Sequence, residues 1–243
     1  YVQSGKTSNY IGLINKAIDV GYKFIVVLAG IHNNLTLQTQ KRIDEGVIGV
    51  SLDSSGIKKN VGIRDRNIIP AHFFKEAEKP QFLTTSFPGK TGDFNINALQ
   101  QNGVDFDNNA PLIAVVKKNV HPLNHLNSWL EQSIGLNGGV TSDKPVLIID
   151  DECDQASVNN NFDPDNYFKA YEGEDGTVDT ENTPSAINGH IQALLSKFRK
   201  RAYVGYTATP YANVLIPIDN EAYSDINPEH FIVRLDQPSN YHG

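Results

Sequence analysis

Short runs of apolar, often β-branched residues recur along the chain, and amphipathic segments separate them. Residues 23–29, KFIVVLA, are continuously apolar after the first position, which is typical of a strand buried on both faces of a parallel sheet. Before this run, apolar residues recur at three- to four-residue spacing over residues 6–20, and Gly21 follows as a plausible C-cap. This spacing predicts an amphipathic helix.

The same alternation continues through the rest of the chain. Further strands are predicted at 46–52, 111–117, 145–150, 202–207 and 231–235, and helices at 34–44, 122–134 and 185–200. Strands that alternate with helices predict an α/β fold, in which crossovers place helices on both faces of a mostly parallel sheet. Two stretches, 87–111 and the acidic segment 159–184, lack periodicity and are expected to be long connections or insertions.

Composition narrows the class of protein. The chain has 243 residues, of which 39% are hydrophobic, and it contains no long apolar run or secretion signal, so we expect a soluble, cytoplasmic protein without a membrane span. The net charge of -7 is concentrated at residues 163–181, which contain seven acidic residues and one lysine. The remainder is nearly neutral, which neither supports nor excludes a nucleic-acid partner.

Residues 3–7, QSGKT, match the second half of the phosphate-binding pattern G-x-x-x-x-G-K-[ST]. Gly5 allows close approach of the backbone, Lys6 supplies a cation, Thr7 supplies a hydroxyl for Mg²⁺, and the following helix directs its positive end to the phosphates. A second Gly-Lys-Thr at 89–91 is not followed by a helix pattern, so we expect the first one to bind nucleotide.

The first glycine of that pattern would lie one position before the first residue. The chain also contains no methionine. We therefore expect the sequence to be part of a longer polypeptide, with the strand before the loop lying upstream.

Carboxylates follow the predicted strand at 145–150: Asp150, Asp151, Glu152 and Asp154. One carboxylate can hold Mg²⁺ and the next can orient or deprotonate the attacking water, as phosphate hydrolysis requires. An acidic turn that compensates a helix dipole would give a similar pattern. We favour the metal site, because an anion cradle and a metal-binding carboxylate pair are complementary parts of one site.

Two threonines, Thr207 and Thr209, follow the predicted strand at 202–207 in the sequence TATP. By themselves they could simply end that strand. In combination, QSGKT, DDECD and TATP resemble motifs I, II and III of superfamily 2 helicases and translocases. Longer stretches at 2–44, 114–119, 147–159 and 203–216 resemble the Z-one domain, an ATPase family described as an endonuclease and found in bacterial restriction or defence contexts.

The resemblance implies a RecA-like P-loop NTPase, a three-layer sandwich that spans residues 1–243 as one motor lobe and uses ATP and Mg²⁺. The phosphate-binding residues implied by it are Gln3, Ser4, Gly5, Lys6 and Thr7. Lys6 would contact the β- and γ-phosphates, Thr7 and Asp151 would hold Mg²⁺, and Glu152 would activate water. Thr207 and Thr209 would sense the γ-phosphate, with Asp154 as their link to the carboxylates and Asp150 as a partner at the strand end.

A nucleic-acid surface is implied in the same way, with DNA expected rather than RNA. The residues assigned to it are Asn33, Asn34, Gln38, Arg42, Lys117, Lys118 and Asn119. An ordinary charged turn would explain 117–119 equally well. The second lobe that supplies an arginine finger in such ATPases is not visible, so further domains of the same chain, or a nuclease or methyltransferase partner, are expected.

Two other functions stay open: a nucleotide-gated scaffold without translocation, and a nuclease proper. The sequence shows no convincing acid-x-Lys pair on a strand for a nuclease. His121 and His125 have zinc-binding spacing but lack the glutamate of H-E-x-x-H. Cys153 and Trp129, together with Phe73 and Phe74, are most simply interpreted as core residues.

Overall fold

The computed structural model describes residues 5–52, 58–61, 80–84, 94, 106, 109–134, 141–155, 157, 186–210, 226 and 230–235. At its centre lies a five-stranded sheet with the order β4-β5-β1-β6-β7, and all of its neighbouring strands are parallel. The strands are β1 (Phe24–Ala29), β4 (Gln81–Phe82), β5 (Leu112–Lys117), β6 (Val146–Asp151) and β7 (Arg201–Tyr206). The predicted α/β class with a mostly parallel sheet is confirmed.

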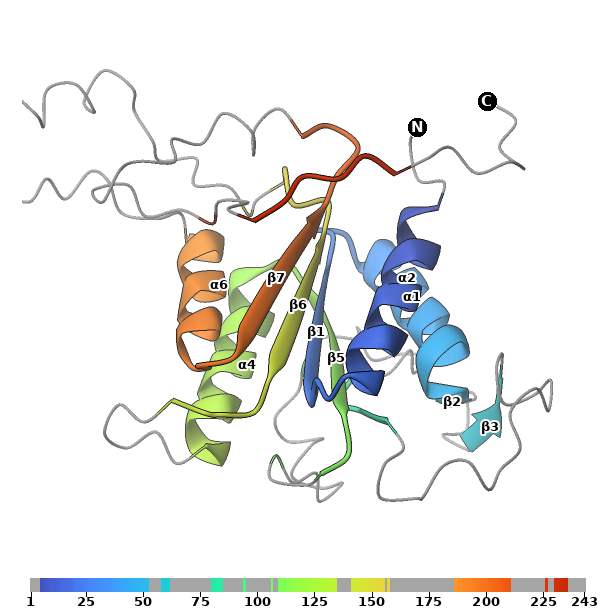
Figure 1. The fold of residues 1–243 in the computed structure, drawn as a ribbon, viewed down its shortest axis with the longest axis horizontal. Helices are drawn as coiled ribbons and strands as arrows, with labels where there is room; N and C mark the ends of the chain where they lie inside the picture. Colours follow the sequence, from blue (N-terminus) through green and yellow to red (C-terminus); the bar gives the residue numbers. More distant parts are fainter. Residues whose placement is uncertain are drawn as a thin grey trace, which may run out of the picture.

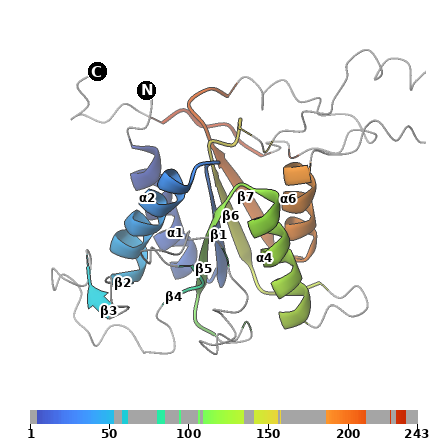
Figure 2. The same ribbon diagram turned by 180° about the vertical axis from the view of Figure 1, so that it is seen from behind.

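Helices cover both faces of this sheet. Helices α1 (Lys6–Asp19) and α2 (Asn33–Ile43) lie on one face, and α4 (Val120–Ser133) and α6 (Ala186–Ser196) lie on the other (Figures 1 and 2). The molecule therefore has three layers in the described part of the chain. None of the helices described is long and apolar enough to cross a membrane.

Strand β1 shows why the apolar run at 23–29 is continuous. All of its six residues are buried. Alternate side chains from Phe24 to Leu28 pack towards α4 and α6, whereas those from Ile25 to Ala29 pack towards α1 and α2. A strand in the middle layer has no solvent-facing side, so neither set of positions is polar.

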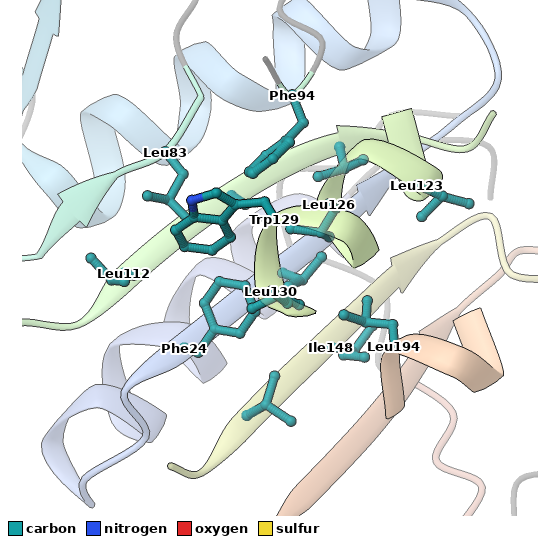
Figure 3. Close-up of a cluster of buried hydrophobic side chains, with 14 of the residues drawn as sticks. Phe24, Leu83, Phe94, Leu112, Leu123, Leu126, Trp129, Leu130, Ile148 and Leu194 are labelled. Carbon is teal, nitrogen blue, oxygen red and sulfur yellow. The ribbon is translucent and has the colours of Figure 1, made fainter. Parts of the chain in front are cut away.

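The larger core cluster contains aromatic side chains beneath α4 (Figure 3). Trp129 lies 5.6 Å from Phe94 and 5.8 Å from Phe106, measured between ring centroids, and the ring of Phe106 also lies 5.6 Å from that of Phe24. The prediction that Trp129 is a core residue is confirmed. Phe73 and Phe74, like the acidic segment 159–184, lie outside the described residues.

The predicted strand at 46–52 is correct only at its end. Residues Asp44–Ile48 form a short π-helix that continues from α2 and ends at Gly49, whose φ is 72°. Strand β2 (Val50–Leu52) follows, and it pairs antiparallel with β3 (Lys58–Asn60), apart from the main sheet. Val47 and Ile48 pack into the core beside α1 and α2. These buried apolar residues therefore give the same sequence pattern as a buried strand.

The predicted strand at 231–235 is wrong. These residues form no strand, and Phe231, Ile232 and Val233 are 60%, 65% and 67% exposed. β-Branched and aromatic residues suit a pleated, half-buried surface, but their propensity cannot supply a neighbouring strand. The predicted helix at 185–200 is also shorter, since α6 ends at Ser196.

The sheet register brings the chemically interesting segments to one edge. Ala29 pairs with Lys117, Leu28 with Asp150, and Asp151 with Tyr206. In a parallel sheet the carboxyl ends of all strands share the same edge, where the loops that follow them form ligand sites. The start of α1 lies at this edge as well (Figure 1).

Candidate nucleotide-binding site

The start of α1 contacts the end of β6 through one ion pair. The Lys6 Nζ lies 3.6 Å from Asp151 Oδ1, and both side chains are largely buried, with 14% and 17% of their surface exposed. Gly5 precedes the helix with a φ of 92°, a left-handed conformation that favours glycine. The chain can therefore turn directly into α1 and place Lys6 in its first position.

A tyrosine hydroxyl contacts the same carboxylate, and a second tyrosine packs against the first. The Tyr10 hydroxyl donates to Asp151 Oδ2 at 3.4 Å, and burial raises the pKa of Tyr10 to about 12, so this phenol stays a proton donor at neutral pH. The Tyr10 ring packs edge-on against Tyr206, whose hydroxyl donates to Asn9 Oδ1 at 2.7 Å. These tyrosines were not among the residues predicted from the sequence; the position of Tyr10 near the start of the apolar face of α1 was the available signal.

One buried oxygen of Asp151 has a cation as its partner. Its Oδ1 is buried and has no hydrogen-bond partner among the described residues, apart from the ion pair with Lys6. The described residues contain no cluster of three or more His, Cys, Asp or Glu side chains that could hold a metal. A Mg²⁺ bound with a nucleotide needs no such cage, because it takes one or two protein oxygens together with phosphates and water. Asp151 and Thr7 fit that requirement.

Glu152 has an unusual backbone conformation. Its φ is 57°, and it is the one non-glycine residue with positive φ in the described part of the chain. Its carboxylate lies beside the end of β1, since a Cβ added at Gly30 would lie 3.3 Å from Glu152 Oε2. Positive φ is unfavourable for a residue with a side chain and often occurs at functional sites.

The two threonines after β7 bind Asp154, as predicted. The Thr207 hydroxyl donates to Asp154 Oδ1 at 2.6 Å, and the Thr209 hydroxyl donates to Oδ2 at 2.5 Å. Desolvation acts to raise the pKa of Asp154, but these hydrogen bonds outweigh it and lower that pKa below its ordinary value. The carboxylate therefore stays ionised and links the segment after β7 to the turn after β6.

Cys153 lies between the same two strand ends. It is buried, as predicted, and its N–H donates to Tyr206 O at 3.1 Å. Burial raises the pKa of its thiol to about 12, so the thiol is inert at neutral pH. A Cβ at Gly205 would lie only 2.7 Å from Cys153 Sγ. This contact explains why the strand has glycine at that position.

Gly205→Ala is therefore expected to lower the free energy of unfolding by about 1–3 kcal/mol through overcrowding. Urea unfolding measures the change, with Gly12→Ala as the control, because a Cβ at Gly12 meets nothing within 4 Å and alanine favours a helix. Adding Cys153→Ala should recover part of the loss. Equal losses with and without Cys153→Ala would show that another contact disfavours a side chain at position 205.

Most residues assigned to a nucleic-acid surface lie at the exposed end of the sheet. Asn33, Asn34 and Gln38 are exposed on α2. Lys117 Nζ donates to Asn33 Oδ1 at 2.7 Å, so the end of β5 and the start of α2 meet there. Asn119 caps α4, with its side chain accepting from the His121 N–H at 3.1 Å, and its assignment stays a prediction.

Arg42 lies closer to the phosphate loop than the sequence suggested. It is exposed on the last turn of α2, and its Nη1 donates to Thr7 Oγ1 at 2.9 Å. The arginine therefore meets the same hydroxyl that was assigned to Mg²⁺. Its role towards a nucleic acid stays a prediction.

Lys118 requires a correction. It is 1% exposed, so it cannot face a nucleic-acid backbone. Its Nζ lies 3.1 Å from Asp150 Oδ1, and the Tyr203 hydroxyl donates to Asp150 Oδ2 at 2.5 Å. Burial raises the pKa of Asp150, while the Lys118 ammonium and the hydrogen bonds oppose that rise. Asp150 is thus a partner at the strand end, as predicted, and Lys118 is the residue it binds.

The remaining predicted phosphate-binding residues, Gln3 and Ser4, lie outside the described residues. The site therefore contains Gly5, Lys6 and Thr7 at the start of α1, the carboxylates at and after the end of β6, and the threonines after β7. Comparisons of the chain with protein-family models, with curated proteins and with solved structures found no match.

Proposed function

We propose that this chain is the ATP-binding and ATP-hydrolysing motor lobe of a superfamily 2 helicase-like or translocase-like protein, with a RecA-like fold of the kind that the Z-one resemblance implies. The observation that carries the proposal is the 3.6 Å approach of Lys6 to Asp151. It joins a lysine at a helix start, which suits phosphate, to a carboxylate at a strand end, which suits Mg²⁺.

Each group at the site has a part in this reaction. Lys6 and the N–H groups at the start of α1 bind the phosphate oxygens, while Thr7 and Asp151 hold Mg²⁺. When bound, the Mg²⁺ neutralises charge that develops on the β- and γ-phosphate oxygens. The Glu152 carboxylate orients the attacking water and accepts its proton.

The contacts of Asp154 suggest how hydrolysis could be relayed. Thr207 and Thr209 both donate to this carboxylate, which lies two residues after Glu152 in the same turn. A change in the turn when the γ-phosphate leaves would therefore move the segment after β7. This is the coupling that a motor needs between its nucleotide site and its track.

DNA is the proposed track, in a cytoplasmic restriction or defence system with a nuclease or methyltransferase partner. The exposed polar side chains of Asn33, Asn34 and Gln38 lie on α2, which follows β1, and Lys117 is the last residue of β5. Amide and ammonium groups of this kind contact phosphates and sugars without reading sequence.

Turnover of ATP by the full-length protein, with and without single- and double-stranded DNA, tests this proposal. We expect DNA to raise the turnover rate, because a motor couples hydrolysis to its track. Turnover that depends on Glu152 but ignores every nucleic acid would favour a nucleotide-gated scaffold. Cleavage of DNA that needs a divalent ion and survives Lys6→Ala would instead indicate a nuclease.

A further inference from the structure

Lys118 is a buried cation that the proposed reaction does not use directly. Its side chain and that of Asp150 are both 0% exposed, and the ion pair between them is 3.1 Å long. Its backbone N–H donates to Ala29 O at 3.1 Å and also reaches Gly30 O at 3.4 Å. Lys118 is therefore held by β1 through its backbone and by the end of β6 through its ammonium.

The same ammonium binds the turn that follows β6. Lys118 Nζ donates to the main-chain carbonyl of Glu152 and, at 3.0 Å, to that of Gln155; Ser157 Oγ lies 3.4 Å away. A lysine ammonium has three donors, and the three hydrogen bonds to Glu152 O, Gln155 O and Ser157 Oγ account for them, while Asp150 pairs with the charge. The turn itself is closed by the Gln155 N–H, which donates to Glu152 O at 2.9 Å.

The bound turn contains the strained residue of the site. Glu152 has a φ of 57°, and such a conformation persists only where surrounding contacts determine it. Its carbonyl oxygen accepts from both Lys118 and Gln155. These bonds fix the peptide group next to the strained dihedral angle, and therefore the direction of the Glu152 side chain towards Gly30.

We propose that Lys118 is a positioning residue for Glu152, because its ammonium clamps the turn after β6 in the conformation that directs the Glu152 carboxylate to the phosphate site. The inference rests on the proposed ATP hydrolysis and deepens it. Lys118 acts from beneath the site, through main-chain carbonyls, and contacts neither Lys6 nor Asp151 among the interactions described above.

Lys118→Met in the full-length protein removes the ammonium and keeps most of the aliphatic stem. We expect kcat for ATP hydrolysis to fall about 10- to 100-fold, since a displacement of roughly 1 Å in a reacting group has effects of that size. The KM for ATP should stay close to the wild-type value, because Lys6 and Thr7 still bind the phosphates. A KM that rises as much as kcat falls would overturn the proposal.

A second variant separates positioning from folding, because Lys118→Met alone leaves Asp150 buried without its cation. Lys118→Met combined with Asp150→Asn removes both charges, and neutral replacements of a buried ion pair often keep stability. We expect the melting temperature to recover towards the wild-type value while kcat stays low. Recovery of kcat together with the melting temperature would show that Lys118 has only a structural role.

Glu152→Gln provides the final comparison. If Lys118 acts through Glu152, Lys118→Met should cause little further loss of turnover in the Glu152→Gln protein. If the double variant instead loses turnover by the product of the two single losses, the two residues act independently and the proposed role of Lys118 is overturned. If Glu152→Gln is impaired while both Lys118 variants turn over ATP normally, only the clamp is wrong. Unaltered turnover in Glu152→Gln, or none in the wild type, would overturn the proposed function and the clamp together.

Discussion

Replacing Glu152 by glutamine is expected to lower the turnover of ATP by at least about 100-fold, the usual scale for loss of a general base. Glutamine has nearly the same shape, but its amide cannot accept the proton of the attacking water. Binding of ATP should persist, because Lys6, Thr7 and Asp151 are unchanged. Steady-state turnover of the full-length protein, together with the affinity for a fluorescent ATP analogue, measures both effects.

Glu131→Gln is the matched control for this change. Glu131 lies on α4, in the opposite helical layer from α1, with its side chain 57% exposed and paired with Lys197. The same chemical change there should leave turnover at the wild-type level. If the two variants hydrolyse ATP equally well, the carboxylate beside Gly30 is not the base, and the assignment of the site to phosphate hydrolysis loses its main catalytic group.

Replacing Lys6 by alanine is expected to weaken ATP binding about 10- to 100-fold, because one hydrogen bond to a charged partner is worth roughly 1.5–3 kcal/mol. Turnover should fall further, by at least about 100-fold, since the ammonium also stabilises charge in the transition state. The dissociation constant for ATP and the turnover rate at saturating ATP separate these two contributions.

The chain contains its own control for Lys6→Ala. Lys90 lies in the second Gly-Lys-Thr, at 89–91. Lys90→Ala therefore removes the same side chain from the same tripeptide. Residues 89–91 lie outside the described residues. We expect Lys90→Ala to bind and hydrolyse ATP as the wild type does. Loss of ATP binding in the Lys90 variant, with normal binding in the Lys6 variant, would move the nucleotide site to the other loop.

The sequence by itself determined the order of the main elements. Apolar periodicity reports which faces are buried, and this signal is strong for β1, β5 and β6 because both of their faces lie in the core. The parallel α/β arrangement then brings the strand ends to one edge. The link from Asp154 to Thr207 and Thr209 was implied by the resemblance to superfamily 2 helicases, and the hydrogen bonds between these residues are present.

Only the tertiary structure decided what each polar residue contacts. Lys117 and Lys118 are neighbours in the sequence, yet one reaches Asn33 at the exposed end of the sheet and the other pairs with buried Asp150. Lys118 follows the last residue of β5, and alternation along a strand cannot tell which of the two charges is buried, because burial depends on the neighbouring strand and helix. For the same reason, the mainly apolar run at 231–235 could not reveal that it pairs with none of the strands in the described part of the chain. Residue type and spacing are properties of a short stretch of sequence, whereas the residue that a side chain contacts comes from elsewhere in the chain.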